Sequence, residues 1–504
     1  MRKIPAAMAT QHPDNALAPF WDEQKDPFVS VHKEIGEAVE CFKRLGVNEY
    51  MWDWEGKHAD AAVIDKLFSD HYEYFSKNQL NRDKFLTFRI PNIWEEKGYS
   101  LLQAMTVILT AEDFAHDLKL TNRPLFEIIL PMTENSDQLM KMHILFEKLA
   151  NFKSKEFTSG TTDNQNIIEL IPLAESIHSQ QTSGKLLRNY VAKYSRRYGK
   201  NPEYIRPFFA RSDPALVSGM LATVLANKIA LSQAYEFSKE SGIPVFPISG
   251  VGSLPFRGGL NPDSLDGYLK EYPGMRTVTI QSSFRYDHPT PKVIEAINEL
   301  ENKMPKTKPV IFNQKTEKAL IGIGEKAERY YHDTLIKIVP QVRNVFDSVP
   351  RRRERRQHIG LLAYGRKVGN EKMPRAITFT AGFYSLGAPP EFIGMGRALK
   401  SLSKSELQLV LDSYKSIKTD LEKAGRYLNT NNLNALAEDN PAWNEVKEDI
   451  ELARQILDLE LQPQNSGEKA HLEATSKILN LSRKPGGKLT KAISDTAVLR
   501  KSLG

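Results

Sequence analysis

Cysteine is nearly absent from this chain of 504 residues, which contains only Cys41. A single cysteine can form neither an intramolecular disulfide nor a thiolate zinc cluster, so the sequence suits the reducing cytoplasm. Long apolar runs are also missing: nowhere do eighteen apolar residues follow one another, so no membrane span is expected. The first dozen residues hold too few apolar side chains for a signal peptide. We therefore predict a cytoplasmic protein without a membrane partner.

Neither sign of charge dominates, since 69 Lys and Arg stand against 62 Asp and Glu, a formal net charge of +7. This surplus fits nucleic acid, an acidic metabolite or an ordinary polar surface. The densest basic run, residues 351–356, has no interleaved aromatic residues for base stacking and is typical of a solvated helix face. We expect no nucleic-acid partner, and RNA binding remains the alternative.

Short apolar runs alternate with amphipathic stretches through most of the chain. The first seven runs begin 34 to 42 residues apart. Strands alternating with helices predict a parallel sheet, and eight such units predict a closed (β/α)8 barrel of the TIM type. The predicted strands are residues 49–55, 84–92, 126–132, 166–175, 204–213, 243–249, 277–284 and 375–383. An open doubly wound sheet is the alternative.

The same pattern divides the chain into three parts. Residues 1–48 form a loop and a helix, with His12 in the loop and the helix near residues 31–44. Residues 49–400 form the catalytic barrel, with a helical insertion at about 286–374 before the eighth strand. Residues 401–504 form a helical region that packs on the barrel or serves assembly. Its last forty residues are rich in Lys and Ser, and the region is expected to end in a mobile tail.

A glycine-rich stretch, Ser249-Gly-Val-Gly-Ser-Leu-Pro-Phe-Arg-Gly-Gly259, follows the sixth predicted strand. Its glycines let the backbone approach a ligand closely. Arg257 adds a planar fork of donors that matches carboxylate or phosphate. The stretch predicts a site for an anion, and a tight turn with a solvent-facing arginine is the alternative.

Charged and polar residues recur where the predicted strands end, and a (β/α)8 barrel has its active site at that edge. They are Asp53, Glu55, Arg89, Glu175, Arg211, Asp213, Arg257 and Gln281. Glu175 and Asp213 end adjacent strands, and Mg²⁺ is commonly held by one or two carboxylates plus water and substrate oxygens. Pairing of each acid with a neighbouring arginine explains them equally well.

Two further groups extend this predicted site. Four arginines would together make a positive pocket for a small polyanion, although each alone fits a surface position equally well: Arg89, Arg257, Arg366 and Arg375. His12 precedes a proline in a loop. A histidine can accept a proton near neutral pH, so His12 is a candidate general base, with a structural role as the alternative.

Six segments together resemble the archaeal-type phosphoenolpyruvate carboxylases, the short class of that enzyme, over nearly the whole chain. They are Thr10-Gln-His-Pro-Asp-Asn15, Leu173-Ala-Glu-Ser176, Ala210-Arg-Ser-Asp-Pro-Ala215, Gly250-Val-Gly-Ser-Leu-Pro-Phe-Arg-Gly-Gly-Leu260, Thr279-Ile-Gln-Ser-Ser-Phe-Arg-Tyr-Asp287 and Ala381-Gly-Phe-Tyr-Ser-Leu-Gly-Ala-Pro-Pro390. The resemblance implies a TIM barrel that carboxylates phosphoenolpyruvate with bicarbonate, using Mg²⁺ or Mn²⁺, to give oxaloacetate and phosphate. It also implies a homotetramer.

The resemblance assigns a role to each candidate residue. It implies that Glu175 and Asp213 bind the metal and that Arg257 lies over the transferred phosphoryl group. His12 resembles the histidine that deprotonates carboxyphosphate. The residues expected to contact the substrates are Arg89, Arg211, Gly252, Gln281, Arg366 and Arg375.

This chain departs from the longer bacterial and plant enzymes at three positions. Those enzymes carry a histidine and a second arginine where Ser249 and Val251 stand, and a lysine where Leu216 stands. The short class shares these differences, and Arg211 is a candidate replacement for the missing cations. Inhibition by aspartate or malate does not carry over. The alternative enzymatic function is another Mg²⁺-dependent lyase or mutase of phosphoenolpyruvate or pyruvate, and the alternative of another class is an RNA-binding protein.

Overall fold

Eight parallel strands form a closed barrel in a computed structural model that describes residues 2–504 except 58, 121, 158–166, 355–365 and 485. The strands are β1 Ala7–Thr10, β2 Glu49–Asp53, β3 Phe85–Arg89, β4 Glu127–Leu130, β5 Glu169–Ala174, β6 Phe208–Ala210, β7 Ile248–Gly250 and β8 Thr277–Ile280. Each strand pairs in parallel with the next, and β1 pairs with β8, where Ala7 lies opposite Val278. The predicted (β/α)8 barrel is confirmed.

One of the eight strands that form the barrel is not the strand that the sequence predicted. The eighth predicted strand, residues 375–383, is a helix, α14 (Ala376–Ser385), and β1 closes the barrel in its place. The predicted helical insertion therefore does not precede the last strand, because its helices follow β8. A run of mixed β-branched and aromatic residues fits a buried strand or a buried helix equally well, and here Phe379 and Phe383 pack inside the C-terminal helices.

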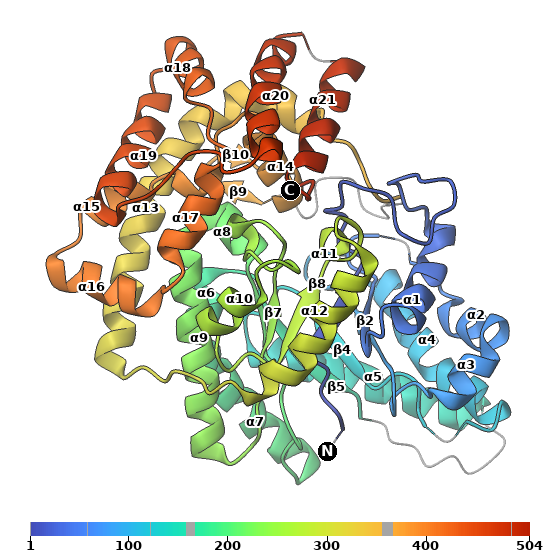
Figure 1. The fold of residues 1–504 in the computed structure, drawn as a ribbon. Coiled ribbons are helices and arrows are strands. Elements are labelled where there is room, and N and C mark those ends of the chain that lie inside the picture. The colour runs from blue at the N-terminus through green and yellow to red at the C-terminus, as the bar shows by residue number, and fades with distance from the viewer. Residues whose placement is uncertain (1, 58, 121, 158–166, 355–365, 485) are drawn as a thin grey trace.

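Helices surround the barrel, as Figure 1 shows. They are α1 Glu34–Lys43, α2 Val63–Asp70, α3 Tyr72–Lys77, α4 Gly98–Asp117, α5 Ser136–Phe157, α6 Ile177–Gln181, α7 Ser183–Tyr198, α8 Ser212–Ser218, α9 Met220–Ser241, α10 Leu265–Glu271, α11 Ser282–Tyr286 and α12 Thr290–Lys303. The predicted helix at residues 31–44 is confirmed by α1 and the 3-10 turn η1 (Val31–Lys33) before it.

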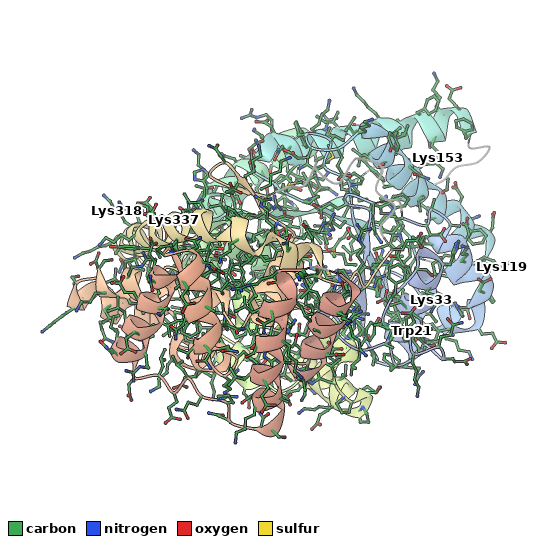
Figure 2. The ribbon with its side chains drawn as sticks, turned by 90° about the horizontal axis from the view of Figure 1, so that it is seen from above. Trp21, Lys33, Lys119, Lys153, Lys318 and Lys337 are labelled. Carbon is green, nitrogen blue, oxygen red and sulfur yellow. The ribbon has the colours of Figure 1, made fainter. Side chains whose placement is uncertain are left out.

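The remaining helices form a bundle over one side of the barrel's upper end (Figure 1). With α14 they are α13 Gln314–Asp347, α15 Met395–Lys400, α16 Lys404–Ser413, α17 Ile417–Gly425, α18 Thr430–Asp439, α19 Trp443–Leu457, α20 Ser466–Ser482 and α21 Gly487–Leu499. Seen from above, Lys318 and Lys337 on α13 lie at the edge opposite Lys119 (Figure 2). The predicted mobile tail is wrong, because α20 and α21 are helices with buried apolar faces and residues 502–504 are buried.

The three largest apolar clusters among the described residues hold these layers together. The largest lies between the strands and the outer helices, and a second fills the C-terminal bundle. The third fills the barrel itself with side chains from the strands: Met8, Met51, Ile129, Ile171, Leu173, Phe208 and Ile248. The barrel interior is therefore a packed core, and only its ends are open to polar chemistry.

The amino-terminal end of the barrel is closed by a buried charge cluster. Arg206 donates from Nη1 to Glu49 and Glu127, each at 2.7 Å, and from Nη2 to Glu49 at 2.7 Å. All three side chains are at most 2% exposed. Because each charge has an opposite partner, the cluster can stay buried at the end away from the predicted site.

Candidate active site

One polar cavity of about 130 Å³ lies at the carboxyl ends of the strands. It collects eight of the ten residues predicted to form the site: His12, Arg89, Glu175, Asp213, Arg257, Gln281, Arg366 and Arg375. Glu55 and Ser212 also line it. A second cavity of about 850 Å³ adjoins it and shares Glu175 and Arg366.

His12 lies two residues after the end of β1, the strand that the sequence prediction missed. Its Nδ1 lies 2.8 Å from the Thr10 hydroxyl, and its carbonyl oxygen accepts from the Ser282 hydroxyl at 2.7 Å. His12 therefore occupies a strand end like the other candidates, which explains why it reaches a cavity lined by residues from across the barrel.

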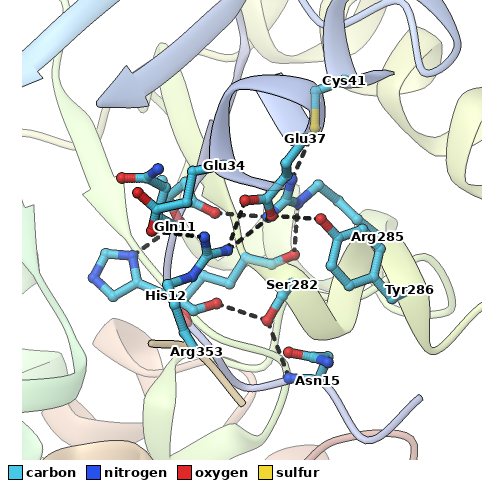
Figure 3. Close-up of polar contacts among 12 residues, drawn as sticks. Gln11, His12, Asn15, Glu34, Glu37, Cys41, Ser282, Arg285, Tyr286 and Arg353 are labelled. Atoms are coloured by element: carbon cyan, nitrogen blue, oxygen red, sulfur yellow. Dashed lines mark hydrogen bonds and ion pairs between the residues drawn. The ribbon is translucent and has the colours of Figure 1, made fainter. Parts of the chain in front are cut away.

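A buried network of ion pairs lies behind His12 (Figure 3). Arg353 pairs with Glu34 at 3.1 Å and with Glu37 at 2.7 Å, and Arg285 donates to Glu37, to Cys41 Sγ and to the Thr10 carbonyl oxygen. Burial would raise the pKa of Glu37, but its two arginines lower it to about 2. The network fixes α1 against the loop that carries His12.

The ion pairs of Arg353 contradict the prediction that the basic run at residues 351–356 is a solvated helix face. Arg352 and Arg353 are 8% and 4% exposed and lie outside any helix, so they do not form a solvated helix face. Arg355 and Arg356 lie outside the described residues. The carboxylates that pair with Arg353 lie on α1, far away in the sequence. The spacing of residues along the chain therefore does not reveal these ion pairs.

The glycine-rich stretch holds Arg257 in a fixed position, at the end of the 3-10 turn η2 (Pro255–Arg257). Its Nε donates to Ser212 Oγ at 3.1 Å, and its Nη1 to Asp14 Oδ2 at 3.1 Å and to the Gly504 carbonyl oxygen. Its Nη2 donates to Gln281. The guanidinium is 1% exposed yet lines the cavity. The alternative of a solvent-facing arginine is therefore wrong, and anion binding by this stretch stays a prediction.

Gly252 makes room for this guanidinium. A Cβ at Gly252 would lie 2.7 Å from Arg257 Cζ, closer than real Cβ atoms approach. The Gly252 amide is already used, because it donates to the Arg257 carbonyl oxygen at 2.8 Å. Gly252 is therefore placed behind Arg257, although the sequence prediction assigned it to the substrate.

Glu175 and Asp213 lie at the ends of β5 and β6 and converge on one positive group. Arg366 Nη2 contacts Glu175 Oε2 and also lies 3.1 Å from Asp213 Oδ2. Burial and the neighbouring Glu55 carboxylate raise the pKa of Glu175 to about 8. At Asp213, burial is outweighed by Arg366, which lowers the pKa. The two carboxylates thus share a cation through one nitrogen atom.

This convergence fits a hard divalent cation. One guanidinium nitrogen reaches an oxygen of each acid, so a metal ion at that position would have two carboxylate ligands. Across the described residues, no group of three or more His, Cys, Asp or Glu side chains is arranged to hold a metal. Mg²⁺ commonly takes its remaining ligands from water and substrate.

Arg89 is held by two acids at the same edge. It donates from Nε and Nη2 to Asp53 at 2.9 and 2.8 Å, and its Nη1 lies 2.5 Å from Glu55 Oε2. Arg375, just before α14, is exposed and lines the cavity from the C-terminal bundle. The wrongly predicted strand therefore still delivers its arginine to the site.

Arg211 does not line the cavity. It is 1% exposed, and Tyr272, Tyr414 and Asp420 surround it on the outer side of the glycine-rich stretch. The prediction that Arg211 contacts substrate is therefore not supported by its position. Its side chain instead packs beneath Gly258, where φ is +116° and a Cβ would lie 3.2 Å from Arg211 Cγ.

Sequence reasoning assigned no role to Asp14 or Ser212, which both contact Arg257. Both lie inside segments already singled out, two residues after His12 and one before Asp213. Asp14 stands out in the structure because it is a completely buried acid close to His12. Burial cannot be seen in the sequence, so the sequence alone does not identify this residue.

The chain matches the family described as phosphoenolpyruvate carboxylase over residues 4–504. It belongs to that family. A phosphoenolpyruvate carboxylase of Leuconostoc mesenteroides is 49% identical over 503 residues, covering 100% of this chain and 99% of the relative. The proteins of that name from Pyrococcus horikoshii and Metallosphaera sedula are 39% and 36% identical over 436 and 522 residues. These alignments cover 84% and 100% of this chain, and 88% and 100% of the relatives. The resemblance found in the six segments is confirmed.

Proposed function

We propose that this member of the phosphoenolpyruvate carboxylase family converts phosphoenolpyruvate and bicarbonate to oxaloacetate and phosphate with Mg²⁺ or Mn²⁺. One observation carries the proposal: a histidine, four arginines and a convergent acid pair from separate strands and helices line one small cavity. Phosphoryl transfer needs positioned cations and little covalent help from the protein, and this cavity supplies them.

The proposed first step is the attack of a bicarbonate oxygen on the phosphorus atom of phosphoenolpyruvate. The bond from phosphorus to the enol oxygen breaks, and its electrons leave with the enolate of pyruvate while carboxyphosphate forms. Arg257 is held by four protein groups before substrate arrives, so its charge can stabilise the phosphoryl oxygens without reorganisation. Glu175 and Asp213 would hold the metal, which supplies Lewis-acid neutralisation of the phosphoryl and enolate oxygens.

In the proposed second step, His12 accepts the proton of the carboxyphosphate carboxyl group. Loss of CO₂ then leaves phosphate, which regains the proton from His12, and the enolate carbon bonds to CO₂ to give oxaloacetate. The cavity is small and its lining is mostly buried, which limits the water that would otherwise protonate the enolate. Arg89, Arg366 and Arg375 are proposed to bind the substrate anions, with Gln281 as a polar contact.

The test is oxaloacetate formation from phosphoenolpyruvate and Mg²⁺, with and without bicarbonate, followed by NADH oxidation through added malate dehydrogenase. We expect bicarbonate-dependent oxidation that is lost in His12→Asn. The matched control is His116→Asn on α4, an exposed histidine outside the cavity, which should keep wild-type turnover. Folded wild-type protein that makes no oxaloacetate with Mg²⁺ or Mn²⁺ would contradict the proposal. The same mixture would then be assayed for phosphate and pyruvate.

We also propose that the chain assembles as a homotetramer and works in the cytoplasm. The family resemblance supports the first point, and the single buried cysteine, Cys41, supports the second. Within the described residues, no helix has the length and apolar content needed to span a membrane. Sedimentation equilibrium of the purified chain tests the assembly, and a mass of one or two subunits would contradict it.

A further inference from the structure

Asp14 is a completely buried carboxylate two residues after His12, with 0% of its surface exposed. It lies in the loop that joins β1 to the rest of the chain, and no part of the proposed reaction uses it. A buried carboxylate is costly unless it is paired and hydrogen-bonded, so its partners show what it holds in place.

One oxygen of Asp14 contacts the proposed phosphoryl-binding arginine. Oδ2 lies 3.1 Å from Arg257 Nη1, and both side chains are at most 1% exposed. In the described part of the chain, Asp14 is the only acidic side chain in an ion pair with Arg257. The other side chains that bind this guanidinium, Ser212 and Gln281, are uncharged, and the remaining partner is the Gly504 main-chain oxygen.

The other oxygen of Asp14 binds the start of α11. Oδ1 accepts from the Ser283 amide at 2.8 Å and lies 3.0 Å from Ser282 Oγ. The same Ser282 hydroxyl donates to the His12 carbonyl oxygen at 2.7 Å and accepts from the Asn15 amide at 3.0 Å (Figure 3). A single carboxylate therefore connects Arg257 to the backbone that carries His12.

We propose that Asp14 is a positioning residue that holds the Arg257 guanidinium at a fixed distance and angle from His12. The inference rests on the proposed function, because it concerns the two groups assigned to phosphoryl and proton transfer. Two catalytic groups that act on one small intermediate must keep constant separation, and a shift of about 1 Å can cost a hundredfold in rate.

The charge of Asp14 makes this role distinguishable from simple structural support. A carboxylate beside Arg257 weakens the attraction of the arginine for any anion. Removal of that charge should therefore strengthen binding of inorganic phosphate even as it loosens the guanidinium and slows turnover. Damage to the fold would weaken binding and turnover together, so the two explanations predict opposite changes in phosphate binding.

The variant for the test is Asp14→Asn, which keeps an oxygen for the Ser283 amide and removes the charge. The matched control is Asp287→Asn. Asp287 is a 5% exposed carboxylate that accepts from the Ala16 and Leu17 amides, so it supports the same loop without contacting Arg257. Both variants are compared with wild type for kcat, KM for phosphoenolpyruvate and inhibition by phosphate, with circular dichroism as the check of folding.

For Asp14→Asn we expect a fall in kcat of about a hundredfold, an unchanged or lower KM, and tighter inhibition by phosphate. Asp287→Asn should keep kcat within about threefold, because the groups that contact the substrates are unchanged. Wild-type kcat in Asp14→Asn, weaker phosphate inhibition, or equal losses in both variants would overturn the inference. A wild-type enzyme that makes no oxaloacetate would overturn the proposed function as well, so the two failures are distinct.

Asp14→Asn leaves the buried Arg257 without its charged side-chain partner, so this variant could fold poorly. A second comparison tests the inference in that case. Asp14→Asn combined with Arg257→Met removes both charges and should fold. If Asp14 acts through Arg257, the double variant should have the same residual kcat as Arg257→Met alone. A further loss of kcat in the double variant would overturn the inference.

Discussion

Arg366 lies 3.1 Å from Asp213, between the two acids proposed to bind the metal. The same Nη2 atom contacts Glu175. Arg366 precedes a short hairpin, β9 (Lys367–Val368) and β10 (Glu371–Lys372), and is anchored to it by the Met373 amide, which donates to the Arg366 carbonyl oxygen at 2.9 Å. A cation supplied by the chain therefore shares its ligands with the proposed metal.

The first prediction concerns this competition. Arg366→Gln should tighten Mn²⁺ binding in the absence of substrate by about tenfold, because a positive charge no longer opposes the metal at Glu175 and Asp213; a tenfold change corresponds to about 1.4 kcal/mol. Binding is measured from the electron paramagnetic resonance signal of free Mn²⁺. The control is Lys367→Gln, an exposed neighbour that removes the same charge and should leave affinity within about twofold. Weaker Mn²⁺ binding in Arg366→Gln would show that the metal binds elsewhere.

The second prediction concerns the space that Gly252 leaves for Arg257. Gly252→Ala should reduce kcat by about a hundredfold while the protein stays folded, because the new methyl group displaces the guanidinium. Gly267→Ala on α10 is the control, since a Cβ there meets nothing within 4 Å. Both are measured by the coupled oxaloacetate assay and by circular dichroism. Full turnover in Gly252→Ala would mean that the position of Arg257 does not limit the rate.

The third prediction concerns Glu391, a 1% exposed acid beneath the glycine-rich stretch. Its Oε1 accepts from the Phe256 amide at 2.9 Å and from the Tyr384 hydroxyl at 2.6 Å, while Oε2 has no partner among the described residues. Burial raises the pKa of Glu391 to about 7. The folded state then holds a proton that the unfolded chain releases near pH 4.5, so stability should fall as pH rises from about 4.5 to 7.

The neutral variant Glu391→Gln should not show this loss. At pH 8 it should be more stable than wild type by on the order of 3 kcal/mol, and near pH 4.5 the two should be alike. Urea unfolding at both pH values measures the difference. An equal gain at both pH values would show that ionisation of Glu391 is not the cause.

The fourth prediction concerns the charge cluster at the opposite end of the barrel. Arg206→Leu should destabilise the fold by about 3–5 kcal/mol, because two buried carboxylates, Glu49 and Glu127, would then share one cation, Arg2, in place of two. Arg188→Leu, which removes an exposed arginine paired with Glu240, should cost less than about 1 kcal/mol. Thermal and urea unfolding give both values. Equal losses would show that the buried cluster contributes no more than a surface pair.

The sequence predicts the barrel because its strands and helices alternate with even spacing, but it does not reveal the strand that closes it. β1 has only four residues, three of them Ala or Met, so it lacks the β-branched pattern that identifies a strand. Residues 375–383 have that pattern and form a helix, because their aromatic side chains pack within a helical bundle. In both segments, β1 and residues 375–383, tertiary packing rather than local sequence pattern determined the secondary structure.

The strand pattern also brings together most of the residues predicted for the site, since eight of the ten line one cavity. Residues at strand ends converge in any (β/α)8 barrel, so Arg89, Glu175 and Asp213 could be placed from the strand pattern alone. Arg211 also follows a strand, yet it lies on the outer side of the glycine-rich stretch. One residue of difference in register turns a side chain from the cavity to the outside, and the spacing of motifs does not fix register so finely.

The closure of the barrel between β1 and β8 sets an order of events during synthesis. Ala7 leaves the ribosome long before its partner Val278, so the first strand has only one neighbour, β2, until β8 has been made. Until then the half-built sheet has two open edges, and open edges invite pairing with other chains. A newly made chain of this protein should depend on chaperones until β8 emerges and is paired with β1.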